Sequence, residues 1–287
     1  MATWFITGAA RGLGRAIAEA LLARGDNVAG TCRKAEDKAA LDALAPGRAI
    51  GIQAEVTDRA AVFAAIADAE ARFGAIDYLV CNAGYGLVAT VEEAQEQEIR
   101  DLFEVNFFGA VNSIQAVLPH MRARRAGHIV AITSVSGLAP WGGFGIYGAS
   151  KHALEGLCQC LAQEVGELGI GVTNVAPGAI ATHFDGDSIR KTPNPIDDYA
   201  GAGHNPRRVY AQPSKKGKAD PADVARAIVE AVTSDNPPLH LLLGADAFFY
   251  AGDKAAQFQA EISRWAPVTL AVSPQVKAGK PVMMDYH

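Results

Sequence analysis

Tyr147 and Lys151 stand four residues apart in the stretch Ile-Tyr-Gly-Ala-Ser-Lys, and Ser134 precedes the tyrosine by thirteen residues. Residues four apart share one face of a helix, so the phenol and the ammonium group can meet. An isolated tyrosine titrates near ~10, and a neighbouring cation lowers that pKa by favouring the phenolate. Such a pair could transfer a proton, although the same spacing also fits an ordinary helix surface.

A glycine-rich turn provides the context for this pair, which alone is a common chance match. Gly8, Gly12 and Gly14 follow the first apolar run in Thr-Gly-Ala-Ala-Arg-Gly-Leu-Gly. Glycine permits a tight turn and a close approach of the backbone to a phosphate. A helix that begins directly after the turn would present free N–H groups to a pyrophosphate. The turn therefore predicts a dinucleotide site.

The elements that must position these residues alternate along the chain. Short apolar runs predict strands, and longer periodic segments predict helices. The expected strands span 3–7, 27–32, 49–54, 76–81, 128–134, 170–177 and 239–244. The expected helices span 12–24, 35–45, 58–73, segments up to 125, 145–168 and 246–264. This order predicts an α/β fold, a single doubly wound (Rossmann) parallel sheet with helices on both faces, whose ligands bind beyond the carboxyl ends of the strands.

We expect residues 1–287 to form one catalytic domain with two additions. Residues 178–219 contain four prolines and few periodic apolar positions, which favours a substrate lid. Residues 245–287 form a carboxyl-terminal extension with one more helical pattern. No internal repeat and no linker are evident in the sequence.

Several motifs, in order along positions 7–182, resemble those of the short-chain dehydrogenase/reductase family. The Gly turn has the family's Thr-Gly-x-x-x-Gly-x-Gly spacing, and Cys-Asn-Ala-Gly at 81–84 resembles its Asn-Asn-Ala-Gly. Asn106 stands in Val-Asn-Phe-Phe-Gly, where the family has a helix asparagine. Ser134, Tyr147 and Lys151 match the family's Ser-to-Tyr spacing and its Tyr-x-x-x-Lys, and Pro177–Thr182 matches its nicotinamide segment.

The resemblance implies hydride transfer between a nicotinamide cofactor and an alcohol or carbonyl carbon. It implies Tyr147 as the acid/base and Lys151 as the cation that lowers the pKa of the tyrosine and binds the nicotinamide ribose. Ser134 would hydrogen-bond the substrate oxygen, with Ser136 as its rival, since it lies close by in Thr-Ser-Val-Ser-Gly. Asn106 would hold a water that connects Lys151 to solvent.

The same resemblance implies a set of cofactor-binding residues. At Ala-Glu-Val the family usually has Asp, so Glu55 is a departure that puts its contact with the adenine in question. Val56 is still expected to line the adenine site. The full set is Gly8, Arg11, Gly12, Leu13, Gly14, Arg33, Glu55, Val56, Asn82, Ala83, Gly84, Tyr147, Lys151, Pro177, Gly178, Ile180 and Thr182.

The second expected strand decides the choice of cofactor. NAD-binding folds place an acidic residue at its end to hold the ribose 2′-hydroxyl, whereas this chain reads Thr-Cys-Arg-Lys at 31–34. A guanidinium group can bind a phosphate through two hydrogen bonds. We therefore predict NADP(H), with Arg33 and Arg11 on the 2′-phosphate, and NAD(H) as the alternative.

The substrate site is expected between Ser134 and Tyr147 and at the start of the lid. Trp141, Phe144, His183 and Phe184 are its candidate walls, together with Ser134 and Tyr147 themselves. Aromatic walls favour a small, largely apolar ketone, aldehyde or alcohol. His183 could also be a second acid/base, although a surface histidine beside the lid is the more economical interpretation.

Composition sets limits on the partners. The formal net charge is −5 and the pI about 5.8, which gives no basic footprint for nucleic acid. No apolar run is long enough to span a membrane, and no leader is evident, so we expect a cytoplasmic protein. The four cysteines lack zinc or disulfide spacing, so we expect buried thiols and no metal. The resemblance implies a homodimer or homotetramer.

Two other functions remain open at this stage. An epimerase or dehydratase could use a bound nicotinamide and the same Tyr-x-x-x-Lys pair. A non-catalytic sensor could bind NADP(H) and control a partner, although such proteins typically lose the tyrosine or the lysine.

Overall fold

A seven-stranded parallel sheet forms the centre of the molecule. The computed structural model describes residues 1–181, 188–200 and 218–272. Within them the strand order is β3-β2-β1-β4-β6-β7-β9, and each neighbouring pair is parallel. The strands are β1 (Thr3–Ile6), β2 (Asn27–Cys32), β3 (Ala49–Gln53), β4 (Tyr78–Cys81), β6 (Gly127–Ile132), β7 (Ile170–Pro177) and β9 (His240–Leu243). This confirms the predicted doubly wound fold.

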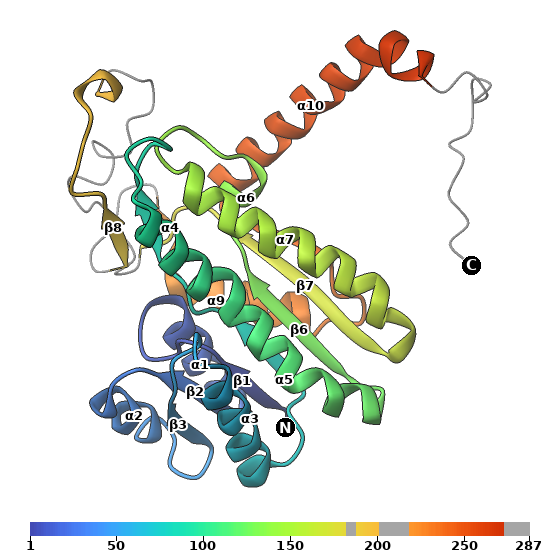
Figure 1. The fold of residues 1–287 in the computed structure, drawn as a ribbon. Helices are drawn as coiled ribbons and strands as arrows, with labels where there is room; N and C mark the ends of the chain where they lie inside the picture. The colour runs from blue at the N-terminus through green and yellow to red at the C-terminus, as the bar shows by residue number, and fades with distance from the viewer. Residues whose placement is uncertain (182–187, 201–217, 273–287) are drawn as a thin grey trace.

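Helices cover both faces of the sheet (Figure 1). The connecting segments are α1 (Gly12–Arg24), α2 (Ala35–Asp42), α3 (Arg59–Phe73), α4 (Glu96–Phe103), a π-helical turn η1 (Glu104–Phe108), α5 (Gly109–Arg124), α6 (Val135–Leu138), α7 (Gly145–Val165), a short 3₁₀ turn η2 (Gly166–Leu168), α9 (Pro221–Val232) and α10 (Ala245–Ala271). Helices α3, α5 and α7 pack on one face and α1, α2 and α9 on the other.

The sheet separates two apolar cores, one on each face, and the side chains of β1 alternate between them. Phe5 lies in the core under α3, α5 and α7, while its neighbours Trp4 and Ile6 lie in the core under α1 and α9. All three side chains are fully buried. Successive residues of a strand point to opposite faces, and burying each such side chain contributes about 2 kcal/mol.

Three parts of the chain differ from the sequence-based expectation. The expected lid contains a strand, β8 (Ile189–Lys191), which pairs in parallel with β5 (Gly86–Val88), and a 3₁₀ turn η4 (Asp197–Tyr199). Helices α6 and α9 were not expected, and α10 extends beyond the predicted 246–264. Cys160 is exposed rather than buried, whereas Cys32, Cys81 and Cys158 are buried thiols.

The strand order brings four strand ends to one edge of the sheet. Strands β1, β4, β6 and β7 are neighbours, and their carboxyl ends are followed by Thr7, Asn82, Thr133 and Gly178. Among the described residues, no helix is long and apolar enough to cross a membrane. The edge formed by these four strands is where a doubly wound fold places its ligands.

Two helix glycines differ in what a side chain would meet. A Cβ on Gly14 in α1 would lie 2.5 Å from Asn82 Nδ2 and 2.5 Å from the Gly8 carbonyl oxygen, whereas a Cβ on Gly156 in α7 would meet nothing within 4 Å. We expect Gly14→Ala to lower the free energy of unfolding by about 2 kcal/mol through overpacking. We expect Gly156→Ala to raise it by about 0.5–1 kcal/mol through helix propensity. Urea unfolding measures both, and a change of the same sign in the two variants would contradict the packing at Gly14.

Candidate active site

One cavity of about 820 Å³ runs along the carboxyl edge of the sheet, from the Gly turn to the start of α7. It brings together most of the residues singled out from the sequence: Gly8, Arg11, Gly12, Leu13, Arg33, Glu55, Val56, Asn82, Ala83, Gly84, Ser134, Trp141, Phe144, Tyr147, Lys151, Pro177, Gly178 and Ile180. Gly14 and Asn106 lie behind its lining. Thr182, His183 and Phe184 lie outside the described residues.

The Gly turn is fixed by hydrogen bonds between the ends of β1 and β4. The Thr7 hydroxyl accepts from the backbone N–H groups of Asn82 and Ala83, at 2.9 and 3.0 Å. The Asn82 amide Nδ2 donates to the carbonyl oxygens of Thr7 and Gly8, at 2.9 and 3.0 Å. The Asn82 side chain thus holds the turn in place. Thr7 was missed as a site residue, although the Thr-Gly start of the motif carried the signal.

The turn leads into an open helix N-terminus. Gly8 and Gly12 have φ values of 67° and 59°, which other residues rarely adopt. Helix α1 begins at Gly12, and its N-cap Arg11 makes no side-chain capping hydrogen bond. Arg11, Gly12 and Leu13 line the cavity. The first N–H groups of α1 are therefore placed to bind an anion at this end of the cavity.

Lys151 is a buried cation at the other end of the cavity. Its side chain comes from the second turn of α7, and its Nζ donates to the carbonyl oxygen of Ile132, at the end of β6, at 2.8 Å. Burial lowers the pKa of the ammonium group from 10.5 to about 8. Gly84 makes room for it, since a Cβ there would lie 3.3 Å from Nζ.

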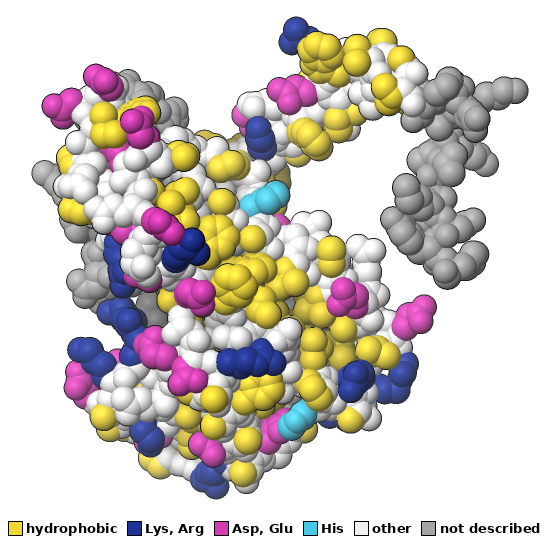
Figure 2. Space-filling model, in the orientation of Figure 1, with side chains coloured by type: hydrophobic (Ala, Val, Ile, Leu, Met, Phe, Trp, Pro, Cys, Tyr) yellow, Lys and Arg dark blue, Asp and Glu magenta, His cyan; other side chains and the backbone are white. Residues whose placement is uncertain are grey.

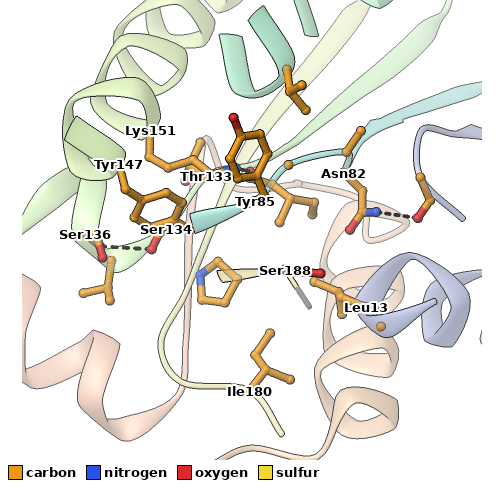
Figure 3. A pocket seen from close by; sticks show the side chains of 18 of the residues that line it. Leu13, Asn82, Tyr85, Thr133, Ser134, Ser136, Tyr147, Lys151, Ile180 and Ser188 are labelled. Carbon is orange, nitrogen blue, oxygen red and sulfur yellow. Dashed lines mark hydrogen bonds between the residues drawn. The ribbon is translucent and has the colours of Figure 1, made fainter. Parts of the chain in front are cut away.

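Tyr147 lies one turn before Lys151 on the same helix, and its side chain is also buried. Its ring packs edge to face against Phe144 with the centroids 5.6 Å apart. Figure 3 shows the tyrosine beside Ser134 and Ser136 on one side of the cavity, with Ile180 and Leu13 across it. The predicted helix face therefore does present the phenol and the ammonium group to one cavity.

Ser134 caps the short helix α6. Its Oγ accepts from the backbone N–H of Ser136 at 3.1 Å, and it is buried at the end of β6. Both serines line the cavity. The Ser136 N–H orients the Ser134 hydroxyl by occupying one acceptor site, which leaves its O–H to donate into the cavity.

Asn106 lies in the π-helical turn η1, between α4 and α5. Its Oδ1 accepts from the Tyr85 N–H at 3.0 Å, and its Nδ2 donates to the Tyr85 carbonyl and the Ser150 hydroxyl at 3.0 and 3.1 Å. The amide therefore fixes the segment after β4. Its expected role in holding a water for Lys151 stays a prediction.

Comparisons with known proteins agree with this geometry. The family model for short chain dehydrogenases matches residues 2–192. The chain belongs to this family. It is an oxidoreductase that acts on CH–OH or C=O groups with NAD(P)(H), as the sequence resemblance implied.

The enzyme is similar in sequence to several oxidoreductases, two of them over most of its length. It is 35% identical over 275 residues to the oxidoreductase BOA17 of Botryotinia fuckeliana, covering 93% of this chain and 98% of that one. It is 34% identical to the 3-ketodihydrosphingosine reductase of Bacteroides thetaiotaomicron, over 83% and 86% of the two chains. Human retinol dehydrogenase 8 is 39% identical over a shorter stretch, 58% of this chain and 55% of the relative.

Solved structures show the same fold. A short-chain dehydrogenase from Streptomyces avermitilis superposes with a TM-score of 0.87 at 39% identity, covering 95% of this chain and all of the other. The alcohol dehydrogenase of Thermococcus sibiricus, solved with 5-hydroxy-NADP, has a TM-score of 0.70 at 25% identity, covering 85% and 97% of the two chains.

The cavity of the enzyme fits a nicotinamide dinucleotide. Its anion site at α1 suits a pyrophosphate, and its length connects that site to Tyr147 and Lys151. The arrangement of β1, α1 and β2 is that of a dinucleotide-binding fold.

Arg33, the residue after β2, is paired with Glu55 in this structure. Its Nε lies 3.6 Å from Glu55 Oε1, and both side chains are about half exposed or more, at 65% and 48%. Lys34 beside it also lines the cavity and pairs with Glu36 at 3.2 Å. A phosphate bound by Arg33 would therefore compete with the Glu55 carboxylate.

Aromatic side chains form the opposite end of the cavity. The ring of Trp141 lies 5.9 Å from Phe144 and 6.2 Å from Tyr250 of α10. Tyr250 was missed, as were Tyr85 and Arg190, whose guanidinium lies 4.4 Å from the centre of the Tyr85 ring. Tyr85 lies just before β5, Arg190 lies in β8 and Tyr250 lies in α10, and no sequence signal connects them to the motifs.

Asp246, in the first turn of α10, was missed in the same way. Its Oδ2 accepts from the Ala179 N–H at 2.7 Å, and a Cβ on Gly178 would collide with the carboxylate. The carboxylate therefore fixes the segment after β7 that the family motif assigns to the nicotinamide.

Burial of Lys151 has a cost that can be measured. Holding its pKa at about 8 instead of 10.5 destabilises the folded state by about 3 kcal/mol at pH 7. This cost is fully present below pH 8, and it disappears as pH rises to 10.5, because the folded state releases its proton before the unfolded state does. The variant Lys151→Met removes this cost of about 3 kcal/mol. It also loses the hydrogen bond to Ile132, which offsets about 1 kcal/mol of the gain in stability.

We therefore expect Lys151→Met to be about 2 kcal/mol more stable than the wild type at pH 7, with the advantage gone near pH 10.5. Urea unfolding at several pH values measures the difference. The control Lys38→Met removes an exposed lysine paired with Asp42 and should change stability by less than about 1 kcal/mol. A Lys151→Met protein less stable than the wild type at pH 7 would contradict the buried charge.

Proposed function

We propose that the enzyme uses NADP(H) to interconvert a ketone or aldehyde with the corresponding alcohol on a small, largely apolar substrate. One observation supports this most: a buried Lys151 lies one helical turn from Tyr147 in the cavity that begins at the N-terminus of α1. The two relatives named for an alcohol and a ketone, retinol dehydrogenase 8 and 3-ketodihydrosphingosine reductase, are consistent with this chemistry.

The protein holds the cofactor through its backbone turn and its positive groups. The N–H groups at Gly12 and Leu13 would bind the pyrophosphate, and Arg33 with Arg11 would bind the 2′-phosphate. Solved relatives with NADP or its derivatives support this choice over NAD. The bound nicotinamide supplies or accepts the hydride.

The proton is handled by the protein. In reduction the Tyr147 phenol would donate a proton to the oxygen of the substrate as negative charge develops there. The hydroxyl of Ser134 would donate a hydrogen bond to the same oxygen. Lys151, a buried cation one helical turn away, would stabilise the phenolate that remains. We also propose that a water at Asn106 returns the proton from solvent.

The aromatic end of the cavity supports an apolar substrate. Trp141, Phe144 and Tyr250 form an apolar surface next to Tyr147. Burial of such rings against a ligand stabilises binding without polar contacts. His183 and Phe184 remain proposed additions to this surface.

Other parts of the chain complete the proposed enzyme. We propose that residues 1–287 act as one catalytic domain, that 178–219 covers the substrate, and that Thr182 joins the nicotinamide segment. We also propose a cytoplasmic homodimer or homotetramer.

The role of Tyr147 can be tested without knowing the natural substrate. We expect Tyr147→Phe to lower NADPH oxidation on a panel of ketones and aldehydes by about 10³-fold, because it removes the proton donor. The NADPH dissociation constant, from protein fluorescence, should change less than about twofold. Tyr78→Phe is the control, because Tyr78 stacks on Trp4 at the other end of the sheet. Turnover within tenfold of the wild type in Tyr147→Phe would contradict the mechanism, and binding without turnover by the wild type would favour a sensor.

The Arg33–Glu55 pair gives a prediction about the cofactor. Glu55→Gln releases the guanidinium, so NADPH should bind about three- to tenfold more tightly while NADH binding changes little. Arg33→Ala should weaken NADPH binding by about tenfold or more and leave NADH nearly unchanged.

Fluorescence titration with each cofactor measures these changes. Glu19→Gln is the matched control, since Glu19 pairs with Arg15 on the surface of α1. If Arg33→Ala weakens NADPH and NADH equally, the assignment of the 2′-phosphate is wrong.

A further inference from the structure

Helix α10 contributes to the cavity with only one of its faces. Asp246, Tyr250, Asp253, Lys254 and Gln257 line the cavity, and the helix contacts α6 and β9. The rest of the helix projects away from the sheet (Figure 1). Its 27 residues span about 40 Å, far more than those first turns need.

The other face carries large exposed apolar side chains. Phe248, Phe258, Ile262 and Trp265 are 65%, 62%, 48% and 56% exposed. Figure 2 shows apolar side chains along the projecting part of α10, away from the body. A contiguous exposed apolar surface of this kind marks an interaction site.

The spacing of these residues is that of a helix-pairing seam. From Phe248 to Val272 the face advances in alternating steps of three and four residues. The positions are Phe248, Ala251, Ala255, Phe258, Ile262, Trp265, Thr269 and Val272. A sustained three–four repeat is the signature of a helix that packs along another helix. We call these eight positions the α10 seam.

The flanks of the α10 seam distinguish a protein helix from a lipid surface. Lys254 and Glu261 border the middle of the seam on one side, and Gln259 borders it on the other, whereas Phe249, Val268 and Leu270 are exposed apolar side chains outside it. Helix α10 carries three acidic and two basic residues, a net charge of −1. Helices that lie on membranes have a wide apolar face and a polar face rich in Lys and Arg.

We propose that the α10 seam is covered by the same seam of a second copy of this chain, with the two helices antiparallel about a two-fold axis between residues 256 and 257. In this register large side chains face small ones: Ala255 faces Phe258 of the partner subunit, and Ile262 faces the partner's Ala251. Phe248 faces the partner's Trp265, an aromatic pair. Such complementarity fills a helix interface without voids.

The charged residues favour this register over its neighbours. Lys254 of each copy lies beside Glu261 of the partner subunit, so the two-fold axis gives two such ion pairs. A shift by one heptad brings either the two Glu261 or the two Lys254 side chains together, which is unfavourable. A parallel pair would place Lys254 and Glu261 next to the uncharged Gln259 and Ala266. The overlap from Phe248 to Trp265 is about 27 Å long.

The pairing also affects the cavity. Because the neighbouring face of α10 supplies Tyr250, Lys254 and Gln257 to the cavity, a partner along the seam would steady that wall. The pairing itself does not depend on which substrate or cofactor the enzyme uses.

Sedimentation velocity of the full-length protein tests the proposal. Phe258→Glu buries a carboxylate in the apolar seam against the partner's Ala255, and should remove one two-fold step of association by raising its dissociation constant about 100-fold or more. Ala260→Glu adds the same charge on the far side of α10 and should sediment like the wild type. Identical sedimentation of Phe258→Glu and the wild type would overturn the proposal.

A charge exchange tests the antiparallel register and guards against misfolding. Lys254→Glu and Glu261→Lys should each raise the dissociation constant about five- to tenfold, and the double variant should restore it to within about twofold of the wild type. Additive losses in the double variant would overturn the register. Loss of binding to neutral lipid vesicles in Phe258→Glu, with association unchanged, would assign the seam to a membrane instead and also overturn the proposal.

Discussion

The buried ammonium group of Lys151 is the constraint around which the catalytic end of this enzyme is built. A charge removed from water destabilises the fold unless its donors find acceptors, and here the Ile132 carbonyl at the end of β6 accepts from Nζ. Gly84 leaves the space beside Nζ that a Cβ would take. The sheet, the segment after β4 and helix α7 must all be in place for the cation to be tolerated there, and this ties the site to the fold.

The order of the strands in the sheet brings the other side chains of the site to one edge. Neighbouring strands β1, β4, β6 and β7 end at one edge, so Thr7, Asn82 and Ser134 lie along the same edge although they are far apart in sequence. The hydrogen bonds between Thr7 and Asn82 fix the Gly turn against β4, and Asn106 fixes the segment that follows β4. The N-terminus of α1 and the Tyr147–Lys151 face of α7 are therefore held by one frame.

The long strands and helices of this frame could be predicted from the sequence, because their patterns lie within one continuous segment. The strand at 170–177 and the helix at 12–24 have the bounds of β7 and α1, because continuous burial and helical periodicity show in short windows. Tyr147 and Lys151 were found because one helix carries both. Strands β5 and β8 were missed because three residues give no periodic signal and their pairing joins segments about 100 residues apart. The Arg33–Glu55 pair and the contributions of Asp246 and Tyr250 were missed for the same reason: they are tertiary contacts.

The central claim is that the charge of Lys151 favours the phenolate of Tyr147. The most direct measurement is a carbon-13 NMR titration of the ring carbons of labelled tyrosine, with the Tyr147 signal assigned by its absence in Tyr147→Phe. The first proton to leave the coupled pair could come from either group, so the comparison with Lys151→Met decides. The account predicts that Tyr147 ionises at a clearly lower pH in the wild type than in Lys151→Met. Equal midpoints in the two proteins would contradict it.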